Sequence, residues 1–146
     1  MANSNRGLNE MLVNLFNHVM DIESQAVITE EFKDISNNDM HIIEAVGVEE
    51  PRKMSEVAKK LAVTQGTLTT TITGLEKKGY VVRDRSESDK RVVYVTLTER
   101  GKKAFYHHRD FHKNMIKSVV VGLDDEEKRL LYKCLVKLDK FFEFEE

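Results

Sequence analysis

The chain has 146 residues, of which 40% are hydrophobic and 33% charged, with a formal net charge of −2 at pH 7. This is the balance of a globular protein long enough to build a core. No stretch approaches the roughly 18 uncharged apolar residues needed to cross a bilayer, and the first residues show no targeting segment. The single cysteine, Cys134, cannot form an internal disulfide, so we expect a reducing, cytoplasmic setting.

Charge is distributed unevenly along the chain. Residues 51–103 hold 13 of the 23 Lys and Arg residues but only 6 of the 25 Asp and Glu residues, a net charge of +7, and the flanking parts carry −9. A basic middle segment between acidic ends is the pattern expected of a phosphate-binding surface. A solvated charged face is the alternative interpretation of this asymmetry.

Periodic apolar residues predict two helices in the first third of the chain. From Leu8 to about Ile28 they recur at the i, i+3, i+4, i+7 spacing of one helical face. A second helix is expected from Ser36, an N-cap with Asp39 in its first turn, to about Val48. The only proline, Pro51, marks the loop that follows.

Two short helices are predicted next. Ser55 is the expected N-cap of SEVAKKLA, and Thr64 is the expected N-cap of a helix from Gln65 to about Lys78. Gly79 would end that helix because glycine tolerates a left-handed backbone. The connection between the two helices is as short as a helix-turn-helix motif requires.

The last third of the chain predicts a β-hairpin and two helices. YVVRD and RVVYVTL are rich in β-branched and aromatic residues and flank the polar run RSESDK. Thr98 is expected to begin a long helix, and Asp124 with Glu127 a capping box for the final one. Cys134 falls on the apolar face of that final helix, where we expect a buried, inert thiol; an oxidant sensor is the alternative.

The 65–78 helix has an unusual surface opposite its stripe of Leu68, Ile72 and Leu75. Threonines and glycine are poor helix formers, and Gly costs about 1 kcal/mol. They suit a helix that enters the major groove, where Gln pairs with adenine, Thr contacts base edges and Gly permits close approach. Cations at the hairpin tip would reach the minor groove or flanking phosphates. The alternative for the helix is that this face is merely polar. The alternative for the hairpin is that its charged tip serves only solubility. The predicted DNA-contacting residues are Ser55, Thr64, Gln65, Gly66, Thr67, Thr69, Thr70, Thr73, Arg85, Asp89, Lys90 and Arg91.

Nearly the whole chain resembles MarR-family repressors. The resemblance is carried by the SEVAKKL helix, a Thr-capped helix ending in LEKKGYV, a D-x-R wing tip and LTERGKK at the start of the next helix. It implies that Arg91 contacts DNA and that Asp89 braces it. The stretches FKDIS and GTLTTTITGLEKKGY are most similar to FabT-type repressors of fatty-acid synthesis. That similarity implies palindromic operators, with acyl-acyl-carrier-protein as corepressor.

The predicted fold is mainly α with a small β-wing, a winged helix-turn-helix domain plus N- and C-terminal dimerisation helices. The resemblance implies a single MarR-type unit over 1–146, with the DNA-binding region at 36–100 and dimerisation helices at 8–30 and 101–146. A homodimer would bury the outer apolar stripes and space two recognition helices by one turn of DNA. The alternative is that the stripes fold back onto their own chain. They include Leu12, Leu15, Leu131, Leu135, Leu138 and Phe142.

Two effector sites are considered. An acyl chain would suit a pocket between the dimer helices and the DNA-binding region, although the same residues fit an ordinary core. A zinc site is the alternative, because Glu23, His41, His108 and His112 resemble the ligand set of zinc-responsive MarR-type repressors; a hydrogen-bonded histidine cluster is the ordinary interpretation. No cofactor is expected to be required. The candidate pocket residues are Phe16, Met20, Phe32, Ile43, Phe111 and Met115.

An enzyme is not expected. The sequence has no Gly-rich phosphate loop, no nucleophile elbow and no Cys/His arrangement with a supporting acid. A protein-interaction winged helix that no longer binds DNA is the remaining alternative. Such a protein would be expected to lose the wing arginine and the polar recognition face, and both are present.

Overall fold

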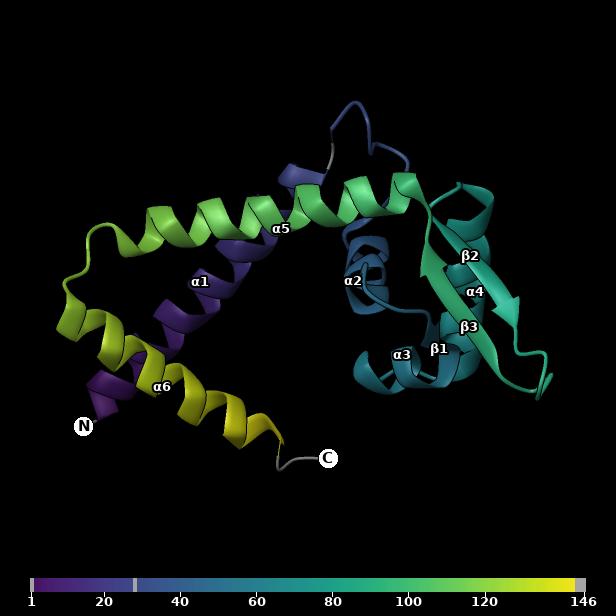
Figure 1. Ribbon diagram of the computed structural model, residues 1–146. Coiled ribbons are helices and arrows are strands. Elements are labelled where there is room, and N and C mark those ends of the chain that lie inside the picture. Colours follow the sequence, from purple (N-terminus) through teal and green to yellow (C-terminus); the bar gives the residue numbers. More distant parts are fainter. Residues whose placement is uncertain (1, 28, 144–146) are drawn as a thin grey trace. The chain divides into compact units, whose positions relative to one another are not determined.

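The computed structural model describes residues 2–27 and 29–143. The chain divides into two compact units, Met1–Arg109 and Asp110–Glu146. Helices and a small antiparallel sheet make up the fold, which confirms the predicted mainly helical class with a β-wing. None of the described helices combines the length and the apolar character that a membrane span requires. In chain order the elements are α1 (Ala2–Val27), α2 (Asn37–Val46), β1 (Arg52–Lys53), α3 (Met54–Lys60), α4 (Gln65–Lys77), β2 (Val81–Arg85), β3 (Val93–Leu97), α5 (Glu99–Val120) and α6 (Asp125–Glu143) (Figure 1).

Local capping signals position most of the helices. Ser36 and Asp39 form a reciprocal capping box at the start of α2, with N–H to side-chain oxygen distances of 3.0 and 3.1 Å. The Thr64 hydroxyl accepts the Thr67 N–H at the start of α4. Asp124 and Glu127 form a second box before α6. These caps are the predicted ones, and they are confirmed.

The start of α3 differs from the prediction. Helix α3 begins at Met54 after Lys53, so the expected N-cap role of Ser55 is wrong. The Glu56 carboxylate accepts the Lys53 N–H instead. The chain is still extended at Lys53 because Arg52–Lys53 pair with β3 as a short strand that the sequence did not indicate. Thr98 does begin α5 (Glu99–Val120) as predicted, because its hydroxyl accepts the Gly101 N–H and its carbonyl accepts the Lys102 N–H.

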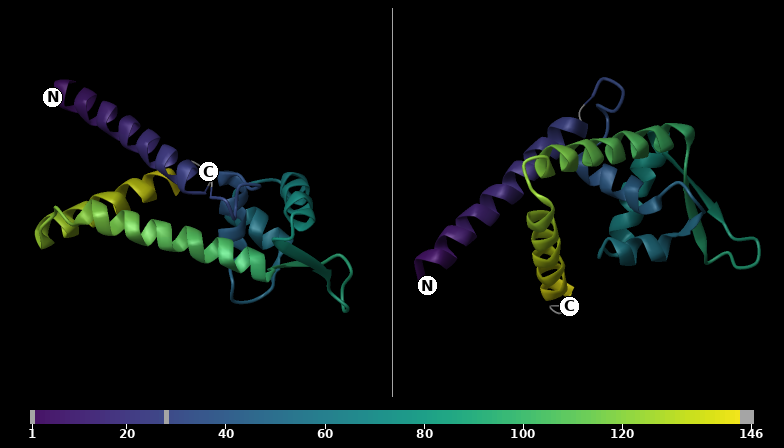
Figure 2. Two further views of the ribbon diagram at one scale, coloured as in Figure 1. Left: turned by 90° about the horizontal axis from the view of Figure 1, so that it is seen from above. Right: turned by 60° about the vertical axis from the view of Figure 1, so that its left-hand side comes forward.

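The sheet has the order β1-β3-β2, with all pairs antiparallel. Val81 pairs with Leu97 at the base of the β2–β3 hairpin, and Arg85 pairs with Val93 near its tip. The predicted hairpin is therefore confirmed, with β1 added along its free edge. The hairpin extends beyond the neighbouring helices of the first unit, so its tip, residues 86–92, is well placed to contact a large ligand (Figures 1 and 2).

The core of the first unit lies between α2, α3, α4 and the sheet. Ile43, Ile72, Leu75, Tyr80 and Val95 are each fully buried there. Helix α4 ends in a turn at Gly79, whose φ of 81° is the left-handed conformation expected of a glycine at this place. The backbone then passes close to the start of α5, where a Cβ on Gly101 would lie 2.1 Å from the Tyr80 carbonyl oxygen.

The outer helices expose apolar side chains. Helix α1 extends away from the rest of the first unit (Figure 2), and Leu15 is exposed on it. On α6, in the second unit, Leu131, Leu135 and Leu138 are exposed as well. Cys134 is also exposed, so the expected buried thiol is wrong for the single chain, because the apolar face of α6 on which it lies is itself exposed. The side chain of Phe142, another predicted stripe residue, and residues 28 and 144–146 of the predicted dimerisation segments lie outside the described residues.

Candidate nucleic-acid interface

Helix α4 buries one side and exposes the opposite one. Leu68, Ile72 and Leu75 belong to the core, as the helical spacing predicts. Gly66 and Thr70 point away from that stripe and are exposed. We call the side of α4 opposite the buried stripe the recognition face. It is formed by Gly66, Thr69 and Thr70, which are exposed, and by Thr73, which is half-buried.

The threonines of α4 use their hydroxyl protons inside the helix. The hydroxyl of each of four threonines donates to the carbonyl oxygen four residues earlier. This bond gives the hydroxyl a partner but slightly destabilises the helix. The donor–acceptor pairs are Thr69 to Gln65 (2.7 Å), Thr70 to Gly66 (3.1 Å), Thr71 to Thr67 (3.2 Å) and Thr73 to Thr69 (2.8 Å).

A basic groove lies beside the recognition face. It has a volume of about 290 Å³ and lies between the start of α3, the start of α4 and the β2–β3 hairpin. Its cations are Lys53, Arg83, Arg85 and Arg91, and no Asp or Glu lines it. Such a groove attracts a polyanion without any sequence preference. Its residues are Lys53, Met54, Ser55, Gln65, Thr69, Arg83, Arg85, Arg91, Val92 and Val93.

One cation of the groove is held by the protein itself. Arg83 donates from Nη2 to Glu76 Oε1 at 3.0 Å, and its backbone N–H donates to Glu76 Oε2 at 2.9 Å. These hydrogen bonds lower the pKa of the Glu76 carboxyl against the opposing effect of its burial. Arg83 therefore fastens strand β2 to helix α4. Sequence reasoning missed this pairing.

The hairpin tip is organised by short-range hydrogen bonds. Ser86 accepts the Asp89 N–H at 3.3 Å, and Asp89 accepts the Arg91 N–H at 3.0 Å. The Arg91 guanidinium lies 3.9 Å from Asp89 Oδ1 and is 95% exposed. Asp89 is thus next to Arg91, as the family resemblance implies, and the arginine points into solvent. Lys90 and Arg85 are also exposed.

The remaining predicted contact residues lie around the same groove. Ser55, in the first turn of α3, lines it together with Gln65. Thr64 and Thr67 bond to each other at the N-terminus of α4, with 2.9 Å between their hydroxyl oxygens. All of the predicted DNA-contacting residues therefore lie in the first unit, on α3, α4, the α3–α4 turn or the hairpin. Contact with DNA stays a prediction.

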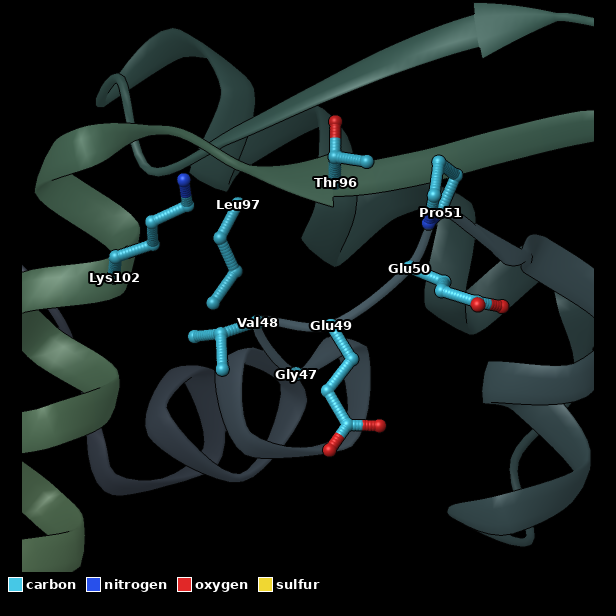
Figure 3. A pocket seen from close by; sticks show the side chains of 8 residues that line it. All are labelled: Gly47, Val48, Glu49, Glu50, Pro51, Thr96, Leu97 and Lys102. Atoms are coloured by element: carbon cyan, nitrogen blue, oxygen red, sulfur yellow. The ribbon is translucent and has the colours of Figure 1, made fainter.

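A smaller pocket shares no lining residue with the basic groove. It has a volume of about 140 Å³ and is formed by the α2–β1 loop, β3 and the start of α5 (Figure 3). Lys102 is paired there with Glu99 at 3.1 Å, and Figure 3 shows the Glu49 and Glu50 side chains turned away from Lys102. The polar groups around this pocket do not converge on one point.

The candidate effector residues are distributed over three environments. Phe32 and Ile43 are buried in the core of the first unit, which confirms the core interpretation for these two. Phe16 and Met20 are exposed on α1. The last two, Phe111 and Met115, are half-buried in the second unit. An acyl pocket built from all six stays a prediction.

Three of the four candidate metal ligands come together. Glu23, His41 and His108 place one ligand atom each within 4.8 Å of one another. Glu23 and His108 are buried, with 3.5 Å between Oε1 and Nε2. Glu44, which the sequence did not single out, lies 3.6 Å from the same nitrogen. Two imidazoles with carboxylates are a donor set that Zn²⁺ accepts. His112, the fourth candidate, belongs to the second unit.

Comparisons with known proteins agree with this arrangement. Residues 35–93 match the MarR family. The crystal structure of Streptococcus pneumoniae FabT in complex with DNA is similar at a TM-score of 0.93, with 39% identity over 97% of this chain and 99% of that one. The uncharacterized HTH-type transcriptional regulator YfiV of Bacillus subtilis is 32% identical over 75% of this chain and 69% of its own length. YpoP of the same organism, also an uncharacterized HTH-type transcriptional regulator, is 28% identical over 74% of this chain and 77% of its own length. The chain belongs to the MarR family of winged helix-turn-helix transcriptional regulators.

Proposed function

We propose that this regulator is a cytoplasmic repressor that binds a palindromic operator as a homodimer. The observation that carries the proposal is the basic groove beside the recognition face of α4. The similar FabT structure, which contains DNA, supports it. Helix α4 enters the major groove with its N-terminal residues, and the hairpin tip reaches the adjacent minor groove or phosphates.

The proposed DNA contacts divide by chemistry. Arg85, Lys90 and Arg91 neutralise phosphates or enter the minor groove, which contributes affinity that falls with salt. Asp89 orients Arg91. The exposed Gln65 amide offers both a donor and an acceptor, which is the pattern that adenine requires in the major groove. Ser55 and the N-terminal end of α4 complete the site.

A titration of labelled operator by fluorescence anisotropy tests this proposal. Arg91→Ala should weaken binding at least tenfold, on the order of 1.4 kcal/mol, and leave the dimer intact. Arg129→Ala is the matched control, because it removes the same charge from an exposed position on α6. Equal affinities of the two variants would refute the wing assignment. A wild-type protein that binds no duplex would favour the protein-interaction alternative.

The homodimer is proposed from the apolar faces of the outer helices. Leu15 on α1 and Leu135 on α6 are both more than half exposed, and stripes of this kind are normally buried in an interface. Segments 8–30 and 101–146 supply that interface, and 36–100 is the DNA-binding region. Leu135→Asp should produce monomers in sedimentation equilibrium and should lower operator affinity, because one subunit contacts only a half-site.

The effector is proposed from the sequence resemblance to FabT-type repressors. Long-chain acyl-acyl-carrier-protein would act as corepressor at fatty-acid synthesis genes by binding more tightly to the DNA-competent arrangement of the dimer. The anisotropy titration, repeated with acyl-acyl-carrier-protein and with unacylated carrier protein as control, should show tighter binding with the acylated form alone. Identical curves would refute the corepressor.

Zinc is a second candidate effector, favoured by the observed cluster of Glu23, His41 and His108. Calorimetric titration with Zn²⁺ should then show binding that His41→Ala and His108→Ala abolish and that His18→Ala, on the exposed part of α1, leaves unchanged. DNA affinity should respond to Zn²⁺ in the wild type only. If both His41→Ala and His108→Ala still show the heat of zinc binding, the zinc site lies elsewhere in the protein.

A further inference from the structure

The base preference of the recognition face follows from its hydroxyl groups. A threonine hydroxyl has one proton to donate and two lone pairs that accept. Thr69, Thr70 and Thr73, which we call the threonine row, all donate that proton to a carbonyl of their own helix. Each hydroxyl therefore meets a partner outside the helix only as an acceptor.

The geometry of the side chain also presents a methyl group. Cβ of threonine carries one oxygen and one methyl group in staggered positions. The oxygen lies 2.7–3.1 Å from the carbonyl of the preceding turn at Thr69 and Thr70, so the methyl group is the part of each exposed side chain that is left to make an apolar contact with a partner. Thr70 is the member of the row that lies most directly opposite the buried stripe of Leu68, Ile72 and Leu75.

The four bases differ in what they offer to such a surface. In the major groove guanine presents only the acceptors N7 and O6, and thymine presents the acceptor O4 together with a C5-methyl group. Adenine presents the acceptor N7 and an amino donor, and cytosine an amino donor. An acceptor-only hydroxyl has no attractive partner on guanine, whereas its methyl neighbour packs against the thymine methyl. The donors needed at the interface are left to Gln65 and to the cations of the basic groove.

We infer that the threonine row contacts thymine methyl groups and excludes guanine at the bases it faces, so that the operator half-site has A·T pairs there. This inference rests on the proposed DNA binding and deepens it. It assigns specificity to the methyl group of Thr70 in particular. The hydroxyl proton of Thr70 takes no part in base recognition and instead holds the side chain in one rotamer against the Gly66 carbonyl.

Paired substitutions and modified DNA test the inference. A duplex is first selected from a random library with the wild-type protein, and each thymine of a half-site is then replaced in turn by deoxyuridine, which lacks only the methyl group. Thr70→Val keeps the methyl group and shape, and Thr70→Ser keeps only the hydroxyl. Thr71→Ser is the control for helix stability, because Thr71 makes the same backbone bond (3.2 Å) but lies on the flank that faces α2.

The expected result has three parts. The wild type loses about fourfold in affinity at one deoxyuridine position, the worth of one methyl group removed from water. Thr70→Val binds within about twofold of the wild type and keeps that sensitivity. Thr70→Ser loses about fourfold on the unmodified duplex and no longer distinguishes thymine from deoxyuridine at that position. Thr71→Ser behaves as the wild type.

Two results would overturn the inference while leaving DNA binding established. One is that the wild-type protein binds every deoxyuridine duplex as tightly as the unmodified duplex. The other is retained affinity in Thr70→Ser with loss in Thr70→Val, which would show that the hydroxyl leaves the helix and donates to a base. If the selection enriches no duplex at all, the proposed function fails, and this inference fails with it.

Discussion

The hydroxyl of Tyr80 donates a 2.6 Å hydrogen bond to the carboxylate of Asp34, which lies 46 residues earlier in the chain. Arg100 joins the same carboxylate with Nη2 at 3.2 Å and lies over the Tyr80 ring, 4.4 Å from its centroid. The three residues come from the α1–α2 loop, the end of the α4–β2 turn and the first turn of α5. They fasten the α1–α2 loop to the end of the α4–β2 turn and to the start of α5.

Tyr80→Phe should destabilise the first unit by about 1.5 kcal/mol, because it removes a hydrogen bond to a charged acceptor from a fully buried ring. Urea unfolding checks this value, and Tyr132→Phe, at an exposed position on α6, is the control. If the two variants unfold at the same urea concentration, the Tyr80 hydroxyl contributes nothing to stability.

Acid should weaken the fold through two carboxyl groups. Hydrogen bonds from Arg83 lower the pKa of Glu76. At Asp34 burial raises the pKa, but hydrogen bonds, chiefly from Tyr80, and the charges of Arg100 and Lys78 together outweigh burial and lower the pKa below its usual 3.8. A carboxyl whose pKa is lower in the folded state binds its proton more readily when unfolded. The stabilisation is therefore complete above the ordinary pKa of 4.5 for Glu76 and is lost as the pH falls through the lower, folded-state value.

Thermal unfolding between pH 7 and pH 3 measures this effect. The wild type should lose stability below about pH 4.5, the ordinary Glu76 value. Glu76→Gln should start less stable at pH 7 and decline less steeply. Glu87→Gln, at the exposed hairpin tip, should follow the wild-type curve. Parallel curves for all three proteins would contradict the assignment.

The two glycines of α4 allow stability and DNA binding to be separated. A Cβ added to Gly66 or to Gly74 meets nothing within 4 Å, so alanine at either position should stabilise the helix by up to about 1 kcal/mol. Only Gly66 belongs to the recognition face, near the helix end that is proposed to enter the major groove. Gly66→Ala should therefore weaken operator binding by about tenfold, and Gly74→Ala should not. A similar affinity for both variants would argue against close approach of DNA at Gly66.

Gly101→Ala should be among the most disruptive single substitutions in the first unit. The new Cβ would lie 2.1 Å from the Tyr80 carbonyl oxygen and 3.1 Å from its carbon, both of them backbone atoms. The start of α5 must then move from the sheet, at a cost of about 3 kcal/mol. Gly122→Ala, where the Cβ meets nothing within 4 Å, is the control in the same unfolding experiment. Unchanged stability in Gly101→Ala would show that α5 shifts without cost.

Short-range patterns predicted most of the fold and the position of the candidate site. The caps at Ser36, Thr64 and Asp124 and the buried stripe of α4 depend on residues within four positions of one another, so the sequence alone specifies them. Strand β1 could not be predicted this way, because two polar residues after Pro51 become a strand only when β3 pairs with them. That pairing also moved the start of α3 away from Ser55.

The interactions that sequence reasoning missed are tertiary ones. Tyr80 and Asp34 are far apart in the chain, and Glu76 and Arg83 lie on either side of the α4–β2 turn. Nothing in their local patterns indicates a partner. Exposure of Cys134 was missed for the opposite reason, because its neighbours predict burial and the surface that would cover α6 is not part of the same chain in the proposed dimer.

The bond between Arg83 and Glu76 has a consequence for the entropy of association. Since it joins the middle of β2 to α4, the proposed recognition helix and the hairpin are already held together in the free protein. In the proposed DNA complex, little backbone ordering would then be needed between these two elements, which lowers the entropic cost of binding. Under the proposed function, affinity should therefore depend little on ordering within each subunit, and an effector would act mainly on the separation between the two subunits of the dimer.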